Sequence, residues 1–279
     1  NAPPLVSIGS PRNHLSDFSW RKCLLKLRWR CLLTNSFVHI PGINKEKEAV
    51  IWQNNILNWQ EFLDNSHKLN LKDKELAHSF IENSISACNS KDYGFFLSNL
   101  PSNEHWRVYK QFNCCFLDIE TTGLSRDYCD VTVIGLYDGN ESKIFINGKN
   151  LDQFPAEIAK YSTIISFNGK CFDVPFLKAK FPEIDFNKFH IDLRYAMKEL
   201  GYSGGLKKIE KEVGICRDDD LQDISGFDAI RLWKQYQRGD EEALKLLVKY
   251  NIADIENLKI LMDFTYEKLR NKCFISNLE

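Results

Sequence analysis

The chain has 279 residues and a formal net charge of -1, which is enough for one large domain or two. Hydrophobic residues make up 43% of the sequence and charged residues 27%, so the composition excludes a disordered chain and a surface that is basic throughout. No apolar run approaches the roughly 18 residues of a membrane span, and the nine cysteines contain no Cys-x-x-Cys pair. We therefore expect a globular protein of the reducing cytoplasm, without disulfides and without a membrane partner.

The first 100 residues predict a helical module that begins with a loose arm. Residues 1–15 contain three prolines, and residues 65–92 form a polar helical pattern. Between them, residues 20–33 mix apolar side chains with five cations: Arg21, Lys22, Lys26, Arg28 and Arg30. This pattern is typical of a packing helix with a solvated basic face. The alternative is a contact to a nucleic-acid backbone, because Lys and Arg neutralise phosphates.

The stretch over residues 37–63 contains a Pro-Gly pair, which predicts a tight turn between two helical patterns. It resembles one helix-hairpin-helix unit, in which backbone N–H groups of the loop hold a DNA phosphate. The resemblance implies that Gly42, Ile43 and Asn44 make this contact. Asn55 departs from the pattern, since a glycine is usual there. A purely structural helical hairpin is the alternative.

From about residue 101 the pattern changes from helical to α/β. Strands are predicted at residues 113–120, 130–137, 143–147, 163–167 and 189–192. Helices are predicted at residues 151–161, at 174–181 and from 193 onward, with Asp240 as one helix start. A meander of three strands followed by alternating strands and helices indicates a mixed sheet with helices on its faces.

Asp118 and Glu120 end the first predicted strand, directly after the apolar run 114–117. Side chains two positions apart in an extended chain point to the same face, so these carboxylates project together. Burying such charges is costly unless something pairs with them, and hard oxygen ligands on one face suit Mg²⁺ or Mn²⁺. A surface strand with solvated acids is the alternative, and the apolar lead-in argues against it.

Two more acidic positions follow along the chain. Asp173 opens a predicted helix soon after the turn at Asn168, a place where Asp is also favoured simply as a helix cap. Tyr250 and Asp254 lie four residues apart on a late helix and therefore share a face. Each feature alone is ambiguous, since an acid and a phenol on a helix are often only surface residues.

The order of these motifs resembles that of the DEDD (DnaQ-like) exonucleases, which have a ribonuclease-H-like fold. The His subclass of that group would carry its histidine five residues before Asp254, where this chain has Lys249, so the resemblance is to the Tyr subclass. Seven spaced blocks over about residues 105–265, including DIETTGLS, SFNGKCFDVPFL and KYNIADIENL, are similar to the YprB-like exonuclease family.

The resemblance implies two-metal phosphodiester hydrolysis, with two Mg²⁺ or Mn²⁺ ions about 3.5–4 Å apart. Asp118 would bridge both ions, Glu120 and Asp254 would serve the ion that activates water, and Asp173 would serve the other ion. Tyr250 would orient the attacking water, because a phenol with a free pKa of about 10 is a poor base at neutral pH.

Several other residues are candidates for contacts to substrate. Thr121 and Thr122 could meet the terminal nucleotide, or they form an ordinary turn at the end of the strand. Asn168 could touch substrate or merely shape its turn. Lys207, at a predicted helix start, is a candidate phosphate contact or part of a solvated face. Asp192 is interpreted as a helix cap.

We therefore expect an α/β protein with two parts. A small all-helical module over residues 1–100 contains the helix-hairpin-helix-like unit, and a ribonuclease-H-like mixed sheet flanked by helices occupies residues 101–279. The expected function is that of a monomeric, metal-dependent 3′→5′ exonuclease that acts on nucleic acid, DNA rather than RNA, with a helicase as a partner. The alternatives are a catalytically silent scaffold that binds nucleic acid, a ribonuclease of the same fold, and a phosphoesterase of small nucleotides.

Overall fold

The computed structural model describes residues 32–278, which belong to one compact unit. The basic segment predicted around residues 21–30 lies outside the described residues. Across residues 32–278, no helix combines the length and the apolar character that a membrane span requires.

A five-stranded sheet with the strand order β3-β2-β1-β4-β5 carries three of the residues predicted to be functional, Asp118, Glu120 and Thr121, on its central strand. Strands β1, β2 and β3 form an antiparallel meander, whereas β4 and β5 run parallel to β1. This arrangement confirms the predicted mixed sheet. The strands are β1 (Cys114–Thr121), β2 (Val131–Tyr137), β3 (Ser142–Ile146), β4 (Thr163–Ser166) and β5 (Phe189–Asp192).

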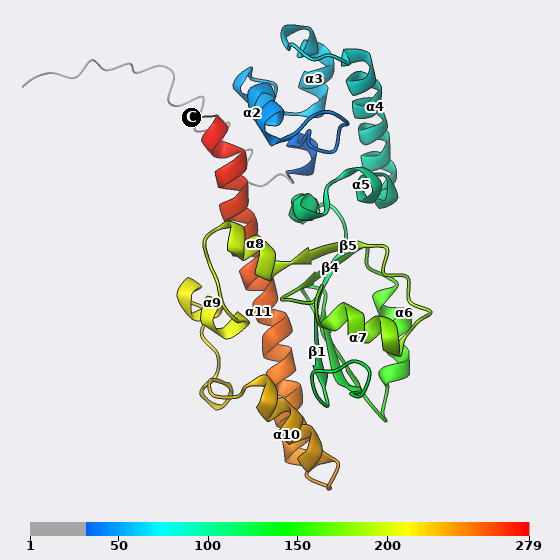
Figure 1. Ribbon diagram of the computed structural model, residues 1–279, viewed down its shortest axis with the longest axis vertical. Coiled ribbons are helices and arrows are strands. Elements are labelled where there is room, and N and C mark those ends of the chain that lie inside the picture. The colour runs from blue at the N-terminus through cyan, green and yellow to red at the C-terminus, as the bar shows by residue number, and fades with distance from the viewer. Residues whose placement is uncertain (1–31, 279) are drawn as a thin grey trace, which may run out of the picture. The chain divides into compact units, whose positions relative to one another are not determined.

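Helices cover both faces of this sheet, as Figure 1 shows. On one face lie α6 (Phe154–Ile158) and α7 (Asp173–Lys180), and on the other lie α10 (Gly226–Tyr236) and the long α11 (Glu241–Cys273). The helix predicted over residues 151–161 is shorter than expected. It consists of a 3₁₀ turn, Leu151–Gln153, followed by α6 with a proline in its first turn.

The alternation of side chains along β1 decides which face receives the acids. Leu117 and Ile119 point into the apolar core beneath α6 and α7. Asp118 and Glu120 therefore point to the opposite face, where Val133 of the neighbouring strand packs in the core formed with α10 and α11.

Along the chain, the segment between β5 and α10 contains α8 (Leu193–Glu199), α9 (Leu206–Val213) and a 3₁₀ turn, Asp219–Leu221.

The residues before the sheet are helical, as the sequence predicts. The elements are the 3₁₀ turn Leu33–Asn35, α2 (Lys45–Gln53), α3 (Trp59–Asn65), the turn Ser66–Lys68, α4 (Lys74–Ser90), α5 (Tyr93–Asn99) and the 3₁₀ helix Ser102–Val108. Their aromatic side chains form a core in which the rings of Trp59 and Phe96 stack with centroids 5.8 Å apart. The domain boundary near residue 100 remains a prediction.

The loop before α2 has a defined geometry. Gly42 adopts a left-handed φ of 81°, and Asn44 caps α2 by accepting a hydrogen bond from the N–H of Lys47 at 3.0 Å. At the other end of α2, Asn55 has a φ of 58°, a left-handed conformation that asparagine tolerates better than most residues. The departure from glycine at this position is thus accommodated by the backbone.

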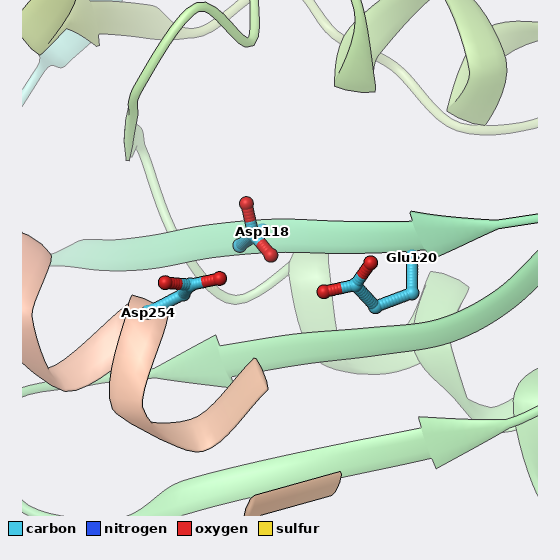
Figure 2. A group of neighbouring side chains, drawn as sticks. All are labelled: Asp118, Glu120 and Asp254. Atoms are coloured by element: carbon cyan, nitrogen blue, oxygen red, sulfur yellow. The ribbon is translucent and has the colours of Figure 1, made fainter. Parts of the chain in front are cut away.

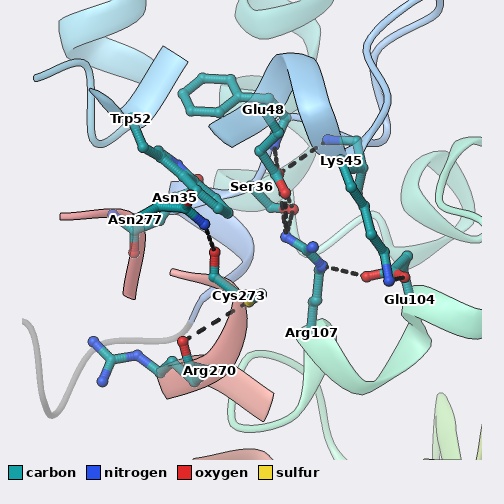
Figure 3. Close-up of polar contacts among 12 residues, drawn as sticks. Asn35, Ser36, Lys45, Glu48, Trp52, Glu104, Arg107, Arg270, Cys273 and Asn277 are labelled. Atoms are coloured by element: carbon teal, nitrogen blue, oxygen red, sulfur yellow. Dashed lines mark hydrogen bonds and ion pairs between the residues drawn. The ribbon is translucent and has the colours of Figure 1, made fainter. Parts of the chain in front are cut away.

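A buried ion cluster joins α2 to the 3₁₀ helix Ser102–Val108 (Figure 3). Arg107 has no exposed surface and pairs with Glu48 at 3.0 Å and with Glu104 at 2.7 Å. Lys45, whose side chain is 47% exposed, adds a second cation from the edge of the cluster by pairing with Glu104 at 2.6 Å. The two acids, Glu48 and Glu104, are therefore paired with two cations, Arg107 and Lys45. Such pairing reduces the free-energy penalty of removing the charges from water.

Candidate active site

The site begins on β1, where Asp118 and Glu120 project from the same face of the strand (Figure 2). The pairing of β1 with β2 shifts register between Glu120 and Thr121, so a β-bulge lies directly beside the acids. Such irregularities re-aim side chains and are frequent next to active sites.

Helix α11 brings Asp254 to these two acids. One carboxylate oxygen from each of Asp118, Glu120 and Asp254 lies within 4.8 Å of the others, and Figure 2 shows Asp254 directed at β1 from its helix. Tyr250 lies one turn earlier on α11 and lines the same cleft. The spacing of four residues thus places both side chains on the face of α11 that covers the sheet.

Asp173, at the start of α7, completes the set. Its Oδ1 accepts a hydrogen bond of 3.1 Å from the N–H of Ile119, the residue between the two acids of β1. The cap position of α7 belongs to Phe172, and no side chain caps that helix. The alternative that Asp173 is merely an N-cap is therefore wrong, because its carboxylate is held against β1.

A cleft of about 380 Å³ opens above these residues. All five residues predicted to be catalytic line it: Asp118, Glu120, Asp173, Tyr250 and Asp254. Its walls also include the residues Leu124 and Phe227, which are 71% and 75% exposed. A strongly acidic floor is thus combined with apolar, solvent-facing walls.

Burial raises the pKa of every carboxyl group in the cleft. The pKa values of Asp118 and Glu120 lie well above their ordinary range, because burial is reinforced by the charges of Asp254 and Asp173. The pKa of Asp173 rises to about 7 through burial, despite its backbone hydrogen bonds. The pKa of Asp254 rises to about 6 through burial, with Arg217 opposing the rise. Without a cation these acids therefore hold their protons to higher pH than free carboxyl groups do.

The residues fit a divalent cation. Within residues 32–278, Arg217 is the one cationic side chain that pairs with any of the four carboxylates, so their negative charge is under-compensated. Closely spaced carboxylate oxygens are the ligands that Mg²⁺ and Mn²⁺ prefer. Asp118, Glu120, Asp173 and Asp254 could therefore hold such ions.

Asn251, which was not identified as functional from the sequence, supports Asp118. The amide of Asn251 donates a hydrogen bond to Asp118 Oδ2 at 2.9 Å. Asn251 reaches the strand because Gly135, opposite Asp118 on β2, has no side chain. A Cβ atom there would lie 2.1 Å from Asn251 Oδ1. Asn251 is three residues from Asp254 on α11, so its shared helix face could have revealed it.

Arg217 and Glu210 were also missed. Arg217 donates a hydrogen bond to Asp254, 37 positions further along the chain, and pairs with Glu210. Arg217 lies in the loop after α9, and no periodicity in the sequence indicates where an arginine in a loop will point.

The predicted substrate contacts are only partly at the cleft. Thr121 lines it, although its hydroxyl donates to the carbonyl of Gly123 at 2.6 Å, and Thr122 accepts from the N–H of Asp130 at 2.9 Å. Both hydroxyl groups thus help to form the turn after β1. Asn168 also lines the cleft and has a left-handed φ of 65°.

Asp192 has the predicted capping role and a further one. It caps α8 and also accepts hydrogen bonds from the N–H groups of Asn168 and Lys170, at 2.8 and 3.1 Å. The loop that carries Asn168 is therefore fixed to the end of β5.

Lys207 and the loop before α2 lie outside the cleft walls. The ammonium group of Lys207 donates to the carbonyls of Leu221, Gln222 and Ile224. In the helical module, Gly42 is exposed, and the N–H of Ile43 donates to the carbonyl of Ile40 at 3.0 Å. Contacts of these residues to phosphate remain predictions.

Comparison with known proteins gives one family. The family model described as the RNase_H superfamily matches residues 115–266, more than half of the chain. This span runs from β1 through most of α11 and includes every residue that lines the cleft. No curated protein matches the sequence.

Several solved structures are distantly similar. The family B DNA polymerase of Pyrobaculum calidifontis is 15% identical with a TM-score of 0.47, over 60% of this chain and 26% of the polymerase. NrnC of Brucella melitensis with bound Mg²⁺ is 16% identical with a TM-score of 0.41, over 60% of this chain and 79% of NrnC. RNase D of Escherichia coli is 15% identical with a TM-score of 0.39, over 64% of this chain and 48% of RNase D. The matched part thus spans about a quarter of the polymerase and about half of RNase D.

Proposed function

Because the chain belongs to the RNase_H superfamily, we propose that it is a divalent-metal-dependent 3′→5′ exonuclease that hydrolyses DNA. One observation carries the proposal: the oxygens of Asp118, Glu120 and Asp254 converge within 4.8 Å at a cleft that Asp173 and Tyr250 also line. Within the superfamily, the order of these residues supports the YprB-like family and the Tyr subclass of DEDD exonucleases.

The four carboxylates would hold two Mg²⁺ or Mn²⁺ ions, which supply an activated water and neutralise charge on the reacting phosphate. Asn251 keeps Asp118 in place from one side, and the N–H of Ile119 does so for Asp173. The chain thus presents ligands that are already oriented, which lowers the cost of assembling the site.

Tyr250 acts through its protonated hydroxyl. Burial, together with the charges of Asp254, Glu120 and Asp118, raises its pKa above the ordinary value. A phenol that keeps its proton donates a hydrogen bond and orients water, and it does not act as the base. This matches the role that the Tyr subclass assigns to it.

The walls of the cleft suit the bases of a nucleic-acid end. Leu124 and Phe227 expose apolar surface beside the acids. Nucleobases stack on aromatic rings such as that of Phe227 regardless of sequence, and Leu124 offers them an apolar contact. DNA as the polymer is supported by the loop at Gly42 and Ile43, through its resemblance to a helix-hairpin-helix unit. A helicase partner, a monomeric state and a cytoplasmic location remain predictions.

The test uses DNA and RNA oligomers labelled at either the 3′ or the 5′ end, single- and double-stranded, with Mg²⁺ or Mn²⁺. We expect mononucleotides to be released from the 3′ end of DNA, and Asp118→Ala or Asp254→Asn to abolish their release while the thermal transition persists. Asp127→Asn, at an exposed carboxylate, is the matched control. If the wild type with Mn²⁺ leaves all substrates intact, the proposal is wrong.

A further inference from the structure

Arg217 occupies a buried position beside the acidic site. Helix α9 ends at Val213 and is capped by Gly214, which has a left-handed φ of 84°. The chain then turns back so that Arg217 faces Glu210 on that helix. The side chain of Arg217 is 4% exposed, and that of Glu210 is 1% exposed. Two parallel hydrogen bonds of 2.7 Å join them, from Nε to Oε2 and from Nη2 to Oε1. This bidentate geometry fixes the plane of the guanidinium.

Glu210 is itself fixed to α11. Its Oε1 accepts a hydrogen bond of 3.0 Å from the amide of Asn257. Asn257 lies three residues after Asp254 on the same face of α11. Its hydrogen bond therefore holds the Glu210–Arg217 pair beside Asp254.

From this anchored position, Arg217 reaches both residues of α11 that line the cleft. Its Nη2 donates a hydrogen bond to Asp254 Oδ1. Its guanidinium carbon lies 5.6 Å from the centre of the Tyr250 ring, within the range of a cation–π contact. The ammonium group of Lys207 lies 5.1 Å from the same ring.

Arg217 does not line the cleft. It borders a separate cavity of about 190 Å³, together with Glu210, Lys211 and Cys216. It therefore holds Asp254 from the side away from the space where a substrate would lie. Because Glu210 already neutralises the charge of Arg217, this arginine does little to offset the combined negative charge of the four carboxylates in the cleft.

We propose that Arg217 is a positioning residue, which holds Asp254 and Tyr250 in the orientation that the metal-dependent reaction needs, and that Glu210 is its anchor. This inference rests on the metal-dependent function proposed above. Partners that orient a metal ligand typically change metal affinity or activity by about 10- to 100-fold when they are removed.

The test measures Mn²⁺ binding by calorimetry and exonuclease kinetics on a labelled oligomer. We expect Arg217→Gln to weaken Mn²⁺ binding about 10- to 100-fold and to lower kcat by a similar factor, with KM for the oligomer nearly unchanged. Arg217→Lys should recover part of both losses, since a lysine can reach Asp254 but cannot also form the bidentate pair.

Breaking a buried ion pair can unfold a protein. A second variant, in which both charges are removed, therefore separates the loss of Arg217 from the loss of stability. Glu210→Met combined with Arg217→Met removes both charges, which is often well tolerated, and it should show the same loss of Mn²⁺ affinity. Arg231→Gln on α10 is the control, because Arg231 is 64% exposed and pairs only with Asp228 among the described residues.

Two results would overturn the inference. One is a folded Arg217→Gln protein with wild-type Mn²⁺ affinity and kcat. The other is tighter Mn²⁺ binding, which would make Arg217 a competitor of the ion. If the wild type binds Mn²⁺ but cleaves no nucleic acid, the proposed function fails, while the Mn²⁺ affinity of the variants still decides the role of Arg217.

Discussion

Four carboxyl groups face one cleft, and when no cation is bound their ionisation lowers the stability of the folded protein. Asp118 and Glu120 are surrounded by like charges, and their pKa values are raised by burial first and then by these neighbours. A pKa that is higher in the folded than in the unfolded protein means that ionisation opposes folding. The residues that would serve the reaction therefore destabilise the metal-free protein.

Asp118→Asn should stabilise the metal-free protein and remove its response to Mn²⁺. The amide has the same shape but no charge, so it removes the penalty of a carboxyl group whose pKa is raised by burial, and we expect the free energy of unfolding to increase. Urea unfolding with EDTA and with Mn²⁺ measures both effects. Asp127→Asn is the control, and a lower metal-free stability for Asp118→Asn would contradict this account.

The affinity for Mn²⁺ should fall as the pH falls from about 8 to about 5, because ligands must lose their protons before they bind a metal. Asp173 with a pKa of about 7 and Asp254 with a pKa of about 6 hold protons in this range. For the same reason, the metal-free protein should become less stable as the pH rises through this window, since the folded state then binds more protons than the unfolded state. Calorimetry in buffers of different ionisation enthalpy counts the protons released, and Asp173→Asn should reduce that number at pH 7.

Tyr250→Phe should lower kcat by up to about 100-fold and leave KM nearly unchanged, because the ring stays in place while the hydroxyl that orients water is lost. The raised pKa of Tyr250 predicts that the alkaline side of the pH–rate profile is the same in both proteins. Loss of a basic limb in the variant would instead indicate that Tyr250 is the base.

At the scale of elements, the site depends on the close approach of α11 to β2. Asn251 of α11 packs directly against the backbone of Gly135, where a Cβ atom would overlap its side chain. Because the interior is closely packed, α11 would have to shift to relieve such an overlap. The distance between α11 and the sheet therefore also determines where Asp254 and Tyr250 lie.

Gly135→Ala should therefore destabilise the protein by about 1–3 kcal/mol, as overpacking does, and should weaken Mn²⁺ binding by shifting α11. Gly205→Ala is the matched control, because a Cβ atom at Gly205 meets no atom within 4 Å. Thermal unfolding and Mn²⁺ calorimetry of the two variants make the comparison. Equal behaviour of the two variants would show that α11 can move away from the sheet without consequence.

The elements differ in how far the sequence predicts them. The strands and the acids of β1 follow from a period of two and an apolar lead-in, which are local signals. The resemblance implied a metal-binding role for Asp173, but the contact that holds it did not follow from local signals, because its partner, the N–H of Ile119, lies 54 positions away. Arg217 and Gly135 were missed for the same reason, since their importance comes from contacts with α11 that no local pattern encodes.

At the scale of the whole molecule, the buried ion cluster around Arg107 connects α2 to the segment that leads into the sheet. Removing Arg107 would leave Glu48 and Glu104 with an excess of buried negative charge. The cluster therefore couples the helical module to the rest of the compact unit.

Arg107→Met should lower the free energy of unfolding by about 3–5 kcal/mol, as expected when one partner of a buried ion pair is lost. Urea unfolding followed by two probes would also test the predicted boundary near residue 100, since an independent module would unfold in a separate first transition. Arg126→Met, at an exposed pair of 3.9 Å, should change stability little.

Within residues 32–278, one helix runs from the acidic site to the helical module. Asp254 lies in the middle of α11, and Phe274, just past its last residue, packs edge-on against Trp52 of α2 with ring centroids 5.0 Å apart. The intervening stretch of about 20 residues rises about 30 Å, the length of about nine stacked nucleotides at about 3.4 Å each. Under the proposed function, a nucleic-acid strand that ran from the cleft to this contact would have to span that distance. The number of turns in α11 between Asp254 and Phe274 sets it.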